Sequence, residues 1–416
     1  MLVLDVHEKP SKGLWALLSI QHVFAMFGAT VLVPLLTGLS VSVALFASGI
    51  GTLIYIACTK AKVPVYLGSS FAYIAAISIA SASFGPGSAF IGLMVVGIIY
   101  IVVSFIIKFI GKEWLDSLLP PVVIGPMIAV IGIGLAPVAT GQAGLNPSHP
   151  DLGFLALDIN NSIVAGITFL ATALIATWAK GFFKIVPILG GIIIGYITAI
   201  FFQMVDFAPI AEASFFALPD FTFFGSYNFD LRAVAMFAPI AFVTIAEHIG
   251  DHKVLGSITE RDFIKDPGLD KTLLGDGIAT FVSAILGGPA NTTYGENTGV
   301  IGMTKVASVY VTGLAAVFAI CLSFIGKFSA IIQTIPLPVM GGVLILLFGL
   351  IAGNGLKVMI ESKVDLTKTR NIVIVASMLV IGIGGASFSI NEAFSLTGMS
   401  LAAVIGIFLN LVLKHE

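Results

Sequence analysis

The sequence contains few charged residues for its length. Only 10% of its 416 residues are Asp, Glu, Lys or Arg, whereas 58% are hydrophobic. A soluble domain carries roughly 25% charged residues, because its surface must be hydrated. Soluble multidomain proteins, disordered chains and coiled coils are therefore excluded. The mean hydropathy of +1.08 instead indicates a polytopic membrane protein whose outer surface faces lipid.

Cysteine and clustered basic residues are scarce as well. The two cysteines, Cys58 and Cys321, lie in or beside apolar runs, and their spacing fits no metal site. The net charge is −2, and no basic tract is long enough to indicate nucleic-acid binding. The sequence also lacks a serine elbow, a zinc-ligand cluster and a phosphate-binding loop. We therefore expect neither an enzyme nor a metal, cofactor or nucleic-acid partner.

Long apolar runs are abundant, and they predict an all-α membrane protein. A helix needs about 20 mostly apolar residues to cross a bilayer. The first run is too long for the core of a signal peptide, so we expect it to be retained. The fourteen predicted spans cover residues 14–36, 42–59, 64–83, 87–107, 118–139, 161–179, 185–204, 231–250, 272–287, 291–307, 308–331, 337–356, 370–386 and 393–413.

The positive charges predict an orientation. If both termini are cytoplasmic, all 20 Lys and Arg residues except Arg232 and Lys327 fall in cytoplasmic segments. Short cytoplasmic loops retain positive charge, and a wrong number of spans would have mixed the charges between the two sides. We therefore expect an even number of spans.

The two halves of the chain share a proline and glycine pattern. Leu119-Pro120-Pro121-Val122 and Ile335-Pro336-Leu337-Pro338-Val339 each precede a span rich in glycine. Seven spans per half would insert the second half upside down, as in many secondary transporters, whose substrate site lies at the repeat interface. The alternative is that Pro and Gly simply recur in membrane helices.

Two small-residue segments, 63–73 and 287–299, interrupt apolar runs at matching places in the two halves. Non-helical backbone persists at membrane depth only where protein or a water-filled cavity satisfies it. An extended segment followed by a helix start would also point free N–H groups at a ligand. We therefore expect a binding site here. A surface loop is the alternative for the second segment, although its apolar flanks leave little chain to reach water.

Acidic residues fall inside the predicted spans. A charge near the bilayer centre is costly, so such groups usually face a cavity and serve a function. Glu247 and Glu296 are therefore candidate ligands or proton carriers, whereas Asp276 could equally pack or cap a helix. Asp251 lies four residues after Glu247 and shares its helix face, while His252 does not. A zinc site in this segment lacks a second ligand cluster.

Motifs in five segments of the chain carry a family resemblance, namely residues 21–34, 68–72, 246–250, 291–297 and 335–342. On these motifs the chain resembles the nucleobase–ascorbate transporter family and, within it, is most similar to bacterial uracil permeases. Glu296-Asn297 stands where purine-selective members tend to carry Gln-Asn, which favours uracil. The resemblance covers nearly the whole chain.

The resemblance implies a fold of two inverted seven-span repeats with short strands in spans 3 and 10. It implies a core domain made of residues 14–107 and 231–331, and a gate domain made of residues 118–204 and 337–413. The core would carry the substrate past the gate by elevator-like alternating access. A homodimer formed through the gate domain is also implied.

The resemblance further implies the residues of the site. Glu247 and Glu296 would bind the base through their side chains, and Phe71 and Gly295 through their backbone. Uracil offers two ring N–H donors and two carbonyl acceptors, which such a set can satisfy. The further expected lining residues are Tyr294 and Phe348.

Two departures from uracil permeases affect these expectations. Uracil permeases usually carry a His four residues after the first Glu of the site, whereas this chain has Asp251 at that position. The candidates for proton coupling are therefore Glu247, Asp251 and His252. Phe348 also stands where uracil permeases often carry a Tyr.

We expect a proton-coupled uracil importer of the plasma (inner) membrane. The alternatives are a purine (xanthine or urate) carrier, a sodium-coupled nucleobase carrier and, less consistent with the carboxylates, a small-anion exchanger or channel.

Overall fold

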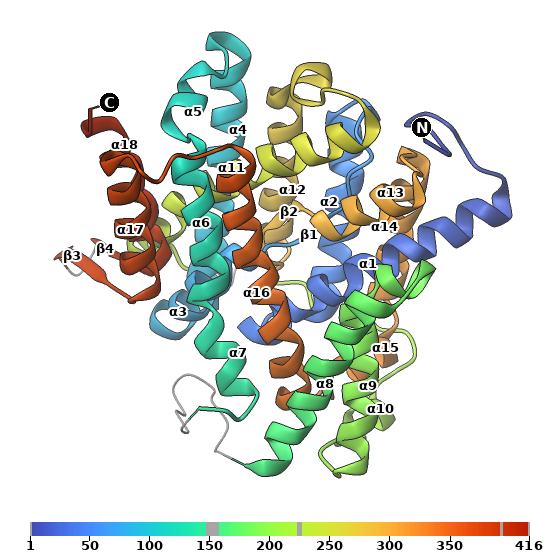
Figure 1. The fold of residues 1–416 in the computed structure, drawn as a ribbon. Coiled ribbons are helices and arrows are strands. Elements are labelled where there is room, and N and C mark those ends of the chain that lie inside the picture. The colour runs from blue at the N-terminus through green and yellow to red at the C-terminus, as the bar shows by residue number, and fades with distance from the viewer. Residues whose placement is uncertain (1, 147–157, 223–226, 392–393, 415–416) are drawn as a thin grey trace.

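Helices make up most of the protein, which is represented by a computed structural model that describes residues 2–146, 158–222, 227–391 and 394–414 (Figure 1). The predicted gate segments therefore include some residues, 147–157 and 392–393, that lie outside this part. The first half of the chain forms α1 (Lys12–Thr37), α2 (Val41–Cys58), β1 (Leu67–Ser69), η1 (Phe71–Tyr73), α3 (Ile74–Phe84), α4 (Pro86–Ile110), α5 (Glu113–Leu118), α6 (Pro121–Gly134), α7 (Ala136–Gln142), α8 (Ile159–Trp178), η3 (Gly181–Ile185), α9 (Pro187–Phe201) and α10 (Ala208–Glu212). The second half forms α11 (Leu231–Thr259), η5 (Ile264–Gly268), α12 (Leu269–Ile285), β2 (Asn291–Thr293), α13 (Gly295–Thr304), α14 (Val309–Ser323), α15 (Gly326–Gln333), α16 (Leu337–Glu361), α17 (Thr369–Ile383), β3 (Ser387–Asn391), β4 (Phe394–Thr397) and α18 (Gly398–Val412).

Length and composition make many of these helices able to cross a bilayer. Among the described residues, 7 helical segments are long and apolar enough, namely α1, α2, α4, α6 with α7, α8, α11 and α16. Shorter apolar helices include α9, α14, α17 and α18. The two ends of the chain both lie near the top of the view in Figure 1.

The last predicted span, residues 393–413, is wrong at its start. Its helix, α18, begins only at Gly398, because Phe394–Thr397 forms β4 and pairs antiparallel with β3. Both strand segments alternate polar and apolar residues, which favours a strand over a helix. This hairpin is absent from the expected fold.

The strands β1 and β2 lie in the two segments that interrupt the apolar runs. They pair antiparallel, with Leu67 opposite Thr293 and Ser69 opposite Asn291. Two strands of three residues cannot stand alone, so the neighbouring helices must satisfy their edges. Thr52 of α2 accepts from the N–H of Leu67 at 2.9 Å, and the amide of Asn291 donates to the carbonyl oxygen of Ala47 at 3.2 Å.

Glycine allows the closest contacts around this ladder. A Cβ atom at Gly68 of β1 would lie 2.3 Å from the ring of Tyr294, and one at Gly51 of α2 would lie 2.5 Å from the Asn291 amide nitrogen. Atoms cannot approach that closely, so each position requires glycine in this packing. The two interrupted segments are thereby pressed together near the middle of the molecule (Figure 1).

The helices α6 and α16, which begin at the two proline motifs, pack directly against one another. A Cβ atom at Gly132 would lie 2.3 Å from the carbonyl oxygen of Phe348, and one at Gly355 would lie 2.5 Å from the backbone nitrogen of Ala129. Small residues let membrane helices approach at backbone distance. The glycine pattern shared by the two halves thus marks the line along which these helices meet.

Candidate functional site

A cavity of about 380 Å³ lies beside the β1–β2 ladder. One wall comes from α1, η1, α11, β2 and α13, which fall in the predicted core segments. The opposite wall comes from α6, α8, α9 and α16, which fall in the predicted gate segments. The cavity therefore lies where these two groups of helices face each other.

Three carboxylates line this cavity: Glu247 and Asp251 of α11, and Glu296 of α13. Glu247 and Asp251 lie one helical turn apart and face the same space, as their spacing predicts. Within the part of the chain that the structure describes, none of the three is hydrogen-bonded or ion-paired to another residue. Their oxygens are free to accept hydrogen bonds from a ligand.

Two helix starts supply donors to the same cavity. Gly295 begins α13 directly after β2, and Phe71 begins η1 directly after β1. Among the described residues, neither N-cap side chain bonds the start of its helix, so first-turn N–H groups are available to a ligand, with that of Glu296 also meeting its own carboxylate. Free N–H groups and the helix dipole attract the acceptor atoms of a ligand. Acceptors and donors thus face a common space.

Aromatic residues shape the cavity without adding a free hydroxyl group. Tyr294 lines it, but the Tyr294 hydroxyl is engaged with Thr30 and Ser69. The Phe71 ring meets the Phe348 ring edge to face, with centroids 6.2 Å apart. Phe348 does not line the described cavity; it is buried and packs its ring against that of Phe71.

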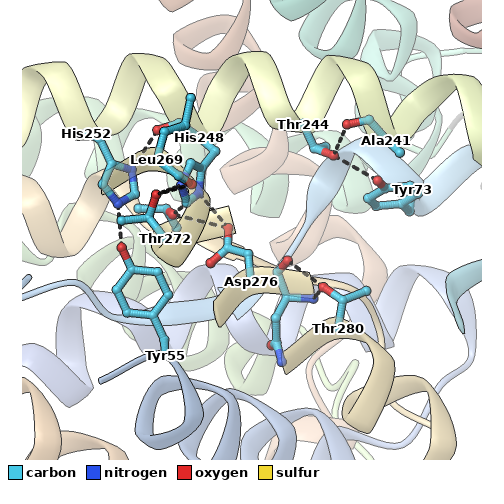
Figure 2. A network of polar contacts seen from close by, with 12 residues as sticks. Tyr55, Tyr73, Ala241, Thr244, His248, His252, Leu269, Thr272, Asp276 and Thr280 are labelled. Carbon is cyan, nitrogen blue, oxygen red and sulfur yellow. Dashed lines mark hydrogen bonds and ion pairs between the residues drawn. The ribbon is translucent and has the colours of Figure 1, made fainter. Parts of the chain in front are cut away.

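The predicted coupling residue His252 lies outside this cavity. It is buried on another side of α11, where its Nδ1 donates to the carbonyl oxygen of His248 at 2.7 Å and its Nε2 meets the hydroxyl of Tyr55 (Figure 2). His248 continues the network, with its Nδ1 2.7 Å from Oδ2 of Asp276. Asp276 lies in the interior of α12, so it is not a helix cap.

This network is the part of the structure that sequence reasoning missed. Its remaining members are Thr272 and Thr293, which contact the imidazole of His248 at 2.9 and 3.2 Å. The signal available was the rule that ionisable residues inside a membrane pair with one another. His248, His252 and Asp276 are such residues, on consecutive helices. Among the described residues, however, no cluster of three or more possible ligands could hold a metal ion.

A second polar contact ties the two halves of the chain together. The amide of Asn297, in the first turn of α13, donates to the carbonyl oxygen of His22 at 3.1 Å, and its nitrogen lies 3.0 Å from His22 Nδ1. Both side chains are buried. The contact fixes α13, which carries Glu296, against α1.

Solved structures with a similar fold include transporters. The transmembrane domain of the cyanobacterial bicarbonate transporter BicA has a TM-score of 0.63 at 15% identity, covering 97% of this chain and 99% of that one. The overall structure of SLC26A9 has a TM-score of 0.68 at 13% identity, covering 96% of this chain and 65% of that one. At these identities the likeness shows the fold alone.

Sequence comparison is more specific. The uracil permease of Bacillus caldolyticus is 50% identical, covering 99% of this chain and 94% of that relative. The uracil permease of Escherichia coli K12 is 44% identical, covering 99% of this chain and 94% of that relative. The putative pyrimidine permease RutG of the same strain is 36% identical, covering 96% of this chain and 90% of that relative. The model of the Xan_ur_permease family, described as a permease family, matches residues 13–390. The chain is therefore an integral membrane permease and not an enzyme, and it belongs to the nucleobase–ascorbate transporter family.

Proposed function

We propose that this permease imports uracil together with protons. The observation that carries the proposal is one cavity wall that brings together three unpaired carboxylates, Glu247, Asp251 and Glu296, and the helix starts at Phe71 and Gly295. Uracil presents two N–H donors and two carbonyl acceptors, so it complements both groups. Relatives named uracil permeases cover nearly the whole chain, which supports the same substrate.

In the proposed complex, Glu247 and Glu296 accept the ring N–H groups of the base. The backbone N–H groups at Phe71 and Gly295 donate to its carbonyl oxygens, and Tyr294 closes one side of the pocket. A site that pairs every edge of its ligand rejects analogues that leave buried groups unpaired. Pyrimidine and purine bases would be separated in this way.

The proposed coupling places a proton on Glu247 when the base is bound, with Asp251 one turn further along α11. Neutralising the loaded site lowers the cost of moving it through a region of low dielectric constant. The core segments, 14–107 and 231–331, then slide against the gate segments, 118–204 and 337–413. His252, the third candidate for proton coupling, lies outside the cavity and therefore does not exchange the proton directly with the bound base in this scheme.

The proposed architecture has fourteen spans in two inverted repeats. Both termini are cytoplasmic in the plasma (inner) membrane, as the distribution of Lys and Arg favours. The packing of α6 on α16 supports the repeat, because the shared proline and glycine motifs of the two halves meet there. A homodimer through the gate segments is proposed on the family resemblance.

The solved structures with a similar fold suggest an alternative cargo, a small anion. BicA is a bicarbonate transporter, and SLC26A9 has also been solved as an anion transporter. The cavity argues against an anion as cargo here. Among the described residues that line it, three carboxylates stand against one cation, Lys184. Like charges repel an anion in a site of low dielectric constant. A purine base or sodium as the coupling ion remain the nearer alternatives.

Binding measurements on the purified full-length protein test the cargo and the site. We expect uracil, but neither xanthine nor sulfate, to bind the wild type and the Glu361→Gln control, whose side chain is exposed on α16. Glu296→Gln should lose most of the affinity, because the new amide offers one acceptor and one repelling donor group. Xanthine or sulfate binding without uracil binding would overturn the proposed substrate. Uptake into vesicles with sodium replaced by choline then separates protons from sodium.

A further inference from the structure

A second acid–base pair lies behind the ladder and apart from the substrate cavity. His248 of α11 and Asp276 of α12 are 0% exposed, and His248 Nδ1 lies 2.7 Å from Asp276 Oδ2 (Figure 2). Neither side chain belongs to the described lining of the cavity. The binding scheme above therefore leaves this pair without a role.

The hydrogen bonds around His248 indicate that the pair holds a proton. Thr272 donates its hydroxyl hydrogen to the carbonyl oxygen of Leu269 at 3.1 Å, so its oxygen accepts from His248 Nε2 at 2.9 Å. A neutral imidazole with hydrogen on Nε2 has none on Nδ1. The 2.7 Å contact with Asp276 then needs one more hydrogen, either on the carboxyl or on the imidazole.

Among the described residues, no Lys or Arg side chain pairs with Asp276 in place of this proton. The second carboxyl oxygen of Asp276, Oδ1, has no hydrogen-bond partner among the described residues. An uncompensated buried charge is strongly unfavourable. The titratable side chains that interact electrostatically with Asp276 are Tyr55 of α2, Tyr73 of η1, Tyr100 of α4, and Glu247, Asp251 and His252 of α11.

The pair is linked both to the substrate site and to a second cavity. Thr293 of β2 lies 3.2 Å from His248 Nδ1 and 3.5 Å from Asp276 Oδ2, and β2 leads directly into Gly295 and Glu296. A cavity of about 950 Å³ lies at the ends of α4, α11 and α12, and we name it the cytoplasmic cavity. Its wall includes His252 and Leu269, which are the outer ends of the network.

We propose that His248 and Asp276 form a proton-binding site distinct from the substrate carboxylates, and that its proton exchanges with the cytoplasm through the cytoplasmic cavity. This inference rests on the proposed uracil–proton transport. Asp276 passes its proton to His248 Nδ1, and His248 releases its Nε2 hydrogen to the oxygen of Thr272. The original hydroxyl hydrogen of Thr272, which points to the carbonyl oxygen of Leu269 on the wall of the cytoplasmic cavity, is then lost to water that enters from that cavity. One proton has then left, and a carboxylate and a neutral imidazole remain.

The test compares two kinds of transport by the purified full chain in lipid vesicles. Exchange of external for internal uracil needs no net proton movement, whereas accumulation against a gradient does. We expect Asp276→Asn to exchange uracil but to accumulate less of it than the wild type under an imposed proton gradient, because Glu247 keeps its proton while the second proton site is lost. Glu247→Gln, which alters the proposed binding site, should lose both. Accumulation by Asp276→Asn at the wild-type level would overturn the proton site while leaving the proposed function intact.

A milder variant covers the case in which Asp276→Asn does not fold. Thr272→Val keeps both members of the pair and removes only the hydroxyl relay, so exchange should persist while accumulation falls below that of the wild type. Normal accumulation by this variant would overturn the route through Thr272.

Infrared spectroscopy tests the site even if uracil is not the cargo. The wild type should show a buried carboxylic acid band that shifts in D₂O and is missing in Asp276→Asn. Failure of the wild type to move uracil would count against the proposed function alone. Identical bands in the two proteins would overturn the proton site itself.

Discussion

The hydroxyl of Tyr294 donates a hydrogen bond to the carbonyl oxygen of Ser69, 3.0 Å away. Ser69 ends β1, and Tyr294 joins β2 to α13, so the bond connects the two interrupted segments at the point where their helices begin. Thr30 of α1 donates to the same hydroxyl at 3.2 Å. The positions of Phe71 and Glu296 on the cavity wall therefore depend on one another.

Removing this hydroxyl should loosen the site. In Tyr294→Phe the buried carbonyl of Ser69 loses its donor, and we expect a stability loss of about 1 kcal/mol, a size typical of side-chain hydrogen bonds between membrane helices. Uracil affinity should fall by roughly fivefold if that loss is expressed in binding. Thermal unfolding and titration with uracil measure the two effects. Tyr310→Phe, at an exposed ring, is the matched control, and equal behaviour of the two variants would contradict the account.

A methyl group at Gly68 should separate the two strands. Its Cβ atom would lie 2.3 Å from the Tyr294 ring, so ladder or ring must shift. Overpacking of this kind costs about 1 to 3 kcal/mol. We expect Gly68→Ala to unfold at lower temperature and to bind uracil weakly. Gly166→Ala on α8 adds the same methyl group into open space and should behave as the wild type.

The contact between α6 and α16 gives a prediction about the gate helices. Gly355→Ala would place a methyl carbon 2.5 Å from the backbone of α6, whereas Gly353→Ala, on the same helix, would meet no atom within 4 Å. We expect only Gly355→Ala to lower the melting temperature. The overpacking should reduce the free energy of unfolding by about 1 to 3 kcal/mol. Equal melting temperatures for the two variants would contradict the close packing.

The link between α13 and α1 should matter for binding. Asn297→Leu keeps the approximate volume of the side chain but leaves the buried carbonyl of His22 without this donor. Unsatisfied buried groups cost about 1 to 3 kcal/mol. We therefore expect lower stability and weaker uracil binding in calorimetry. Asn371→Leu, at the start of α17, removes an exposed hydrogen bond from the side-chain amide to the carbonyl oxygen of Asp365. This control should leave uracil binding unchanged.

The sequence predicts the site well where helix spacing or the cost of unsatisfied backbone in a membrane restricts where a residue can lie. Glu247 and Asp251 share a helix face by spacing alone, and both line the cavity. The segments 63–73 and 287–299 break apolar runs in which only satisfied irregular backbone can persist, and each contains a strand.

Other features depend on contacts between helices far apart in the sequence. Whether His252 faces the cavity or Tyr55 depends on where Tyr55 of α2 lies relative to α11, which a spacing of five residues does not reveal. The pairing of His248 with Asp276 depends in the same way on α12. The β3–β4 hairpin is missed because its short apolar alternation adjoins the long apolar run of α18.

Calorimetric titration of uracil in buffers of different ionisation enthalpy tests most directly the central claim that unpaired carboxylates bind the base together with a proton. The dependence of the measured heat on the buffer gives the number of protons taken up on binding. We predict net proton uptake by the wild type and its loss, with much weaker binding, in Glu247→Gln. Uracil binding without proton uptake, or equal binding and uptake in both proteins, would contradict the account.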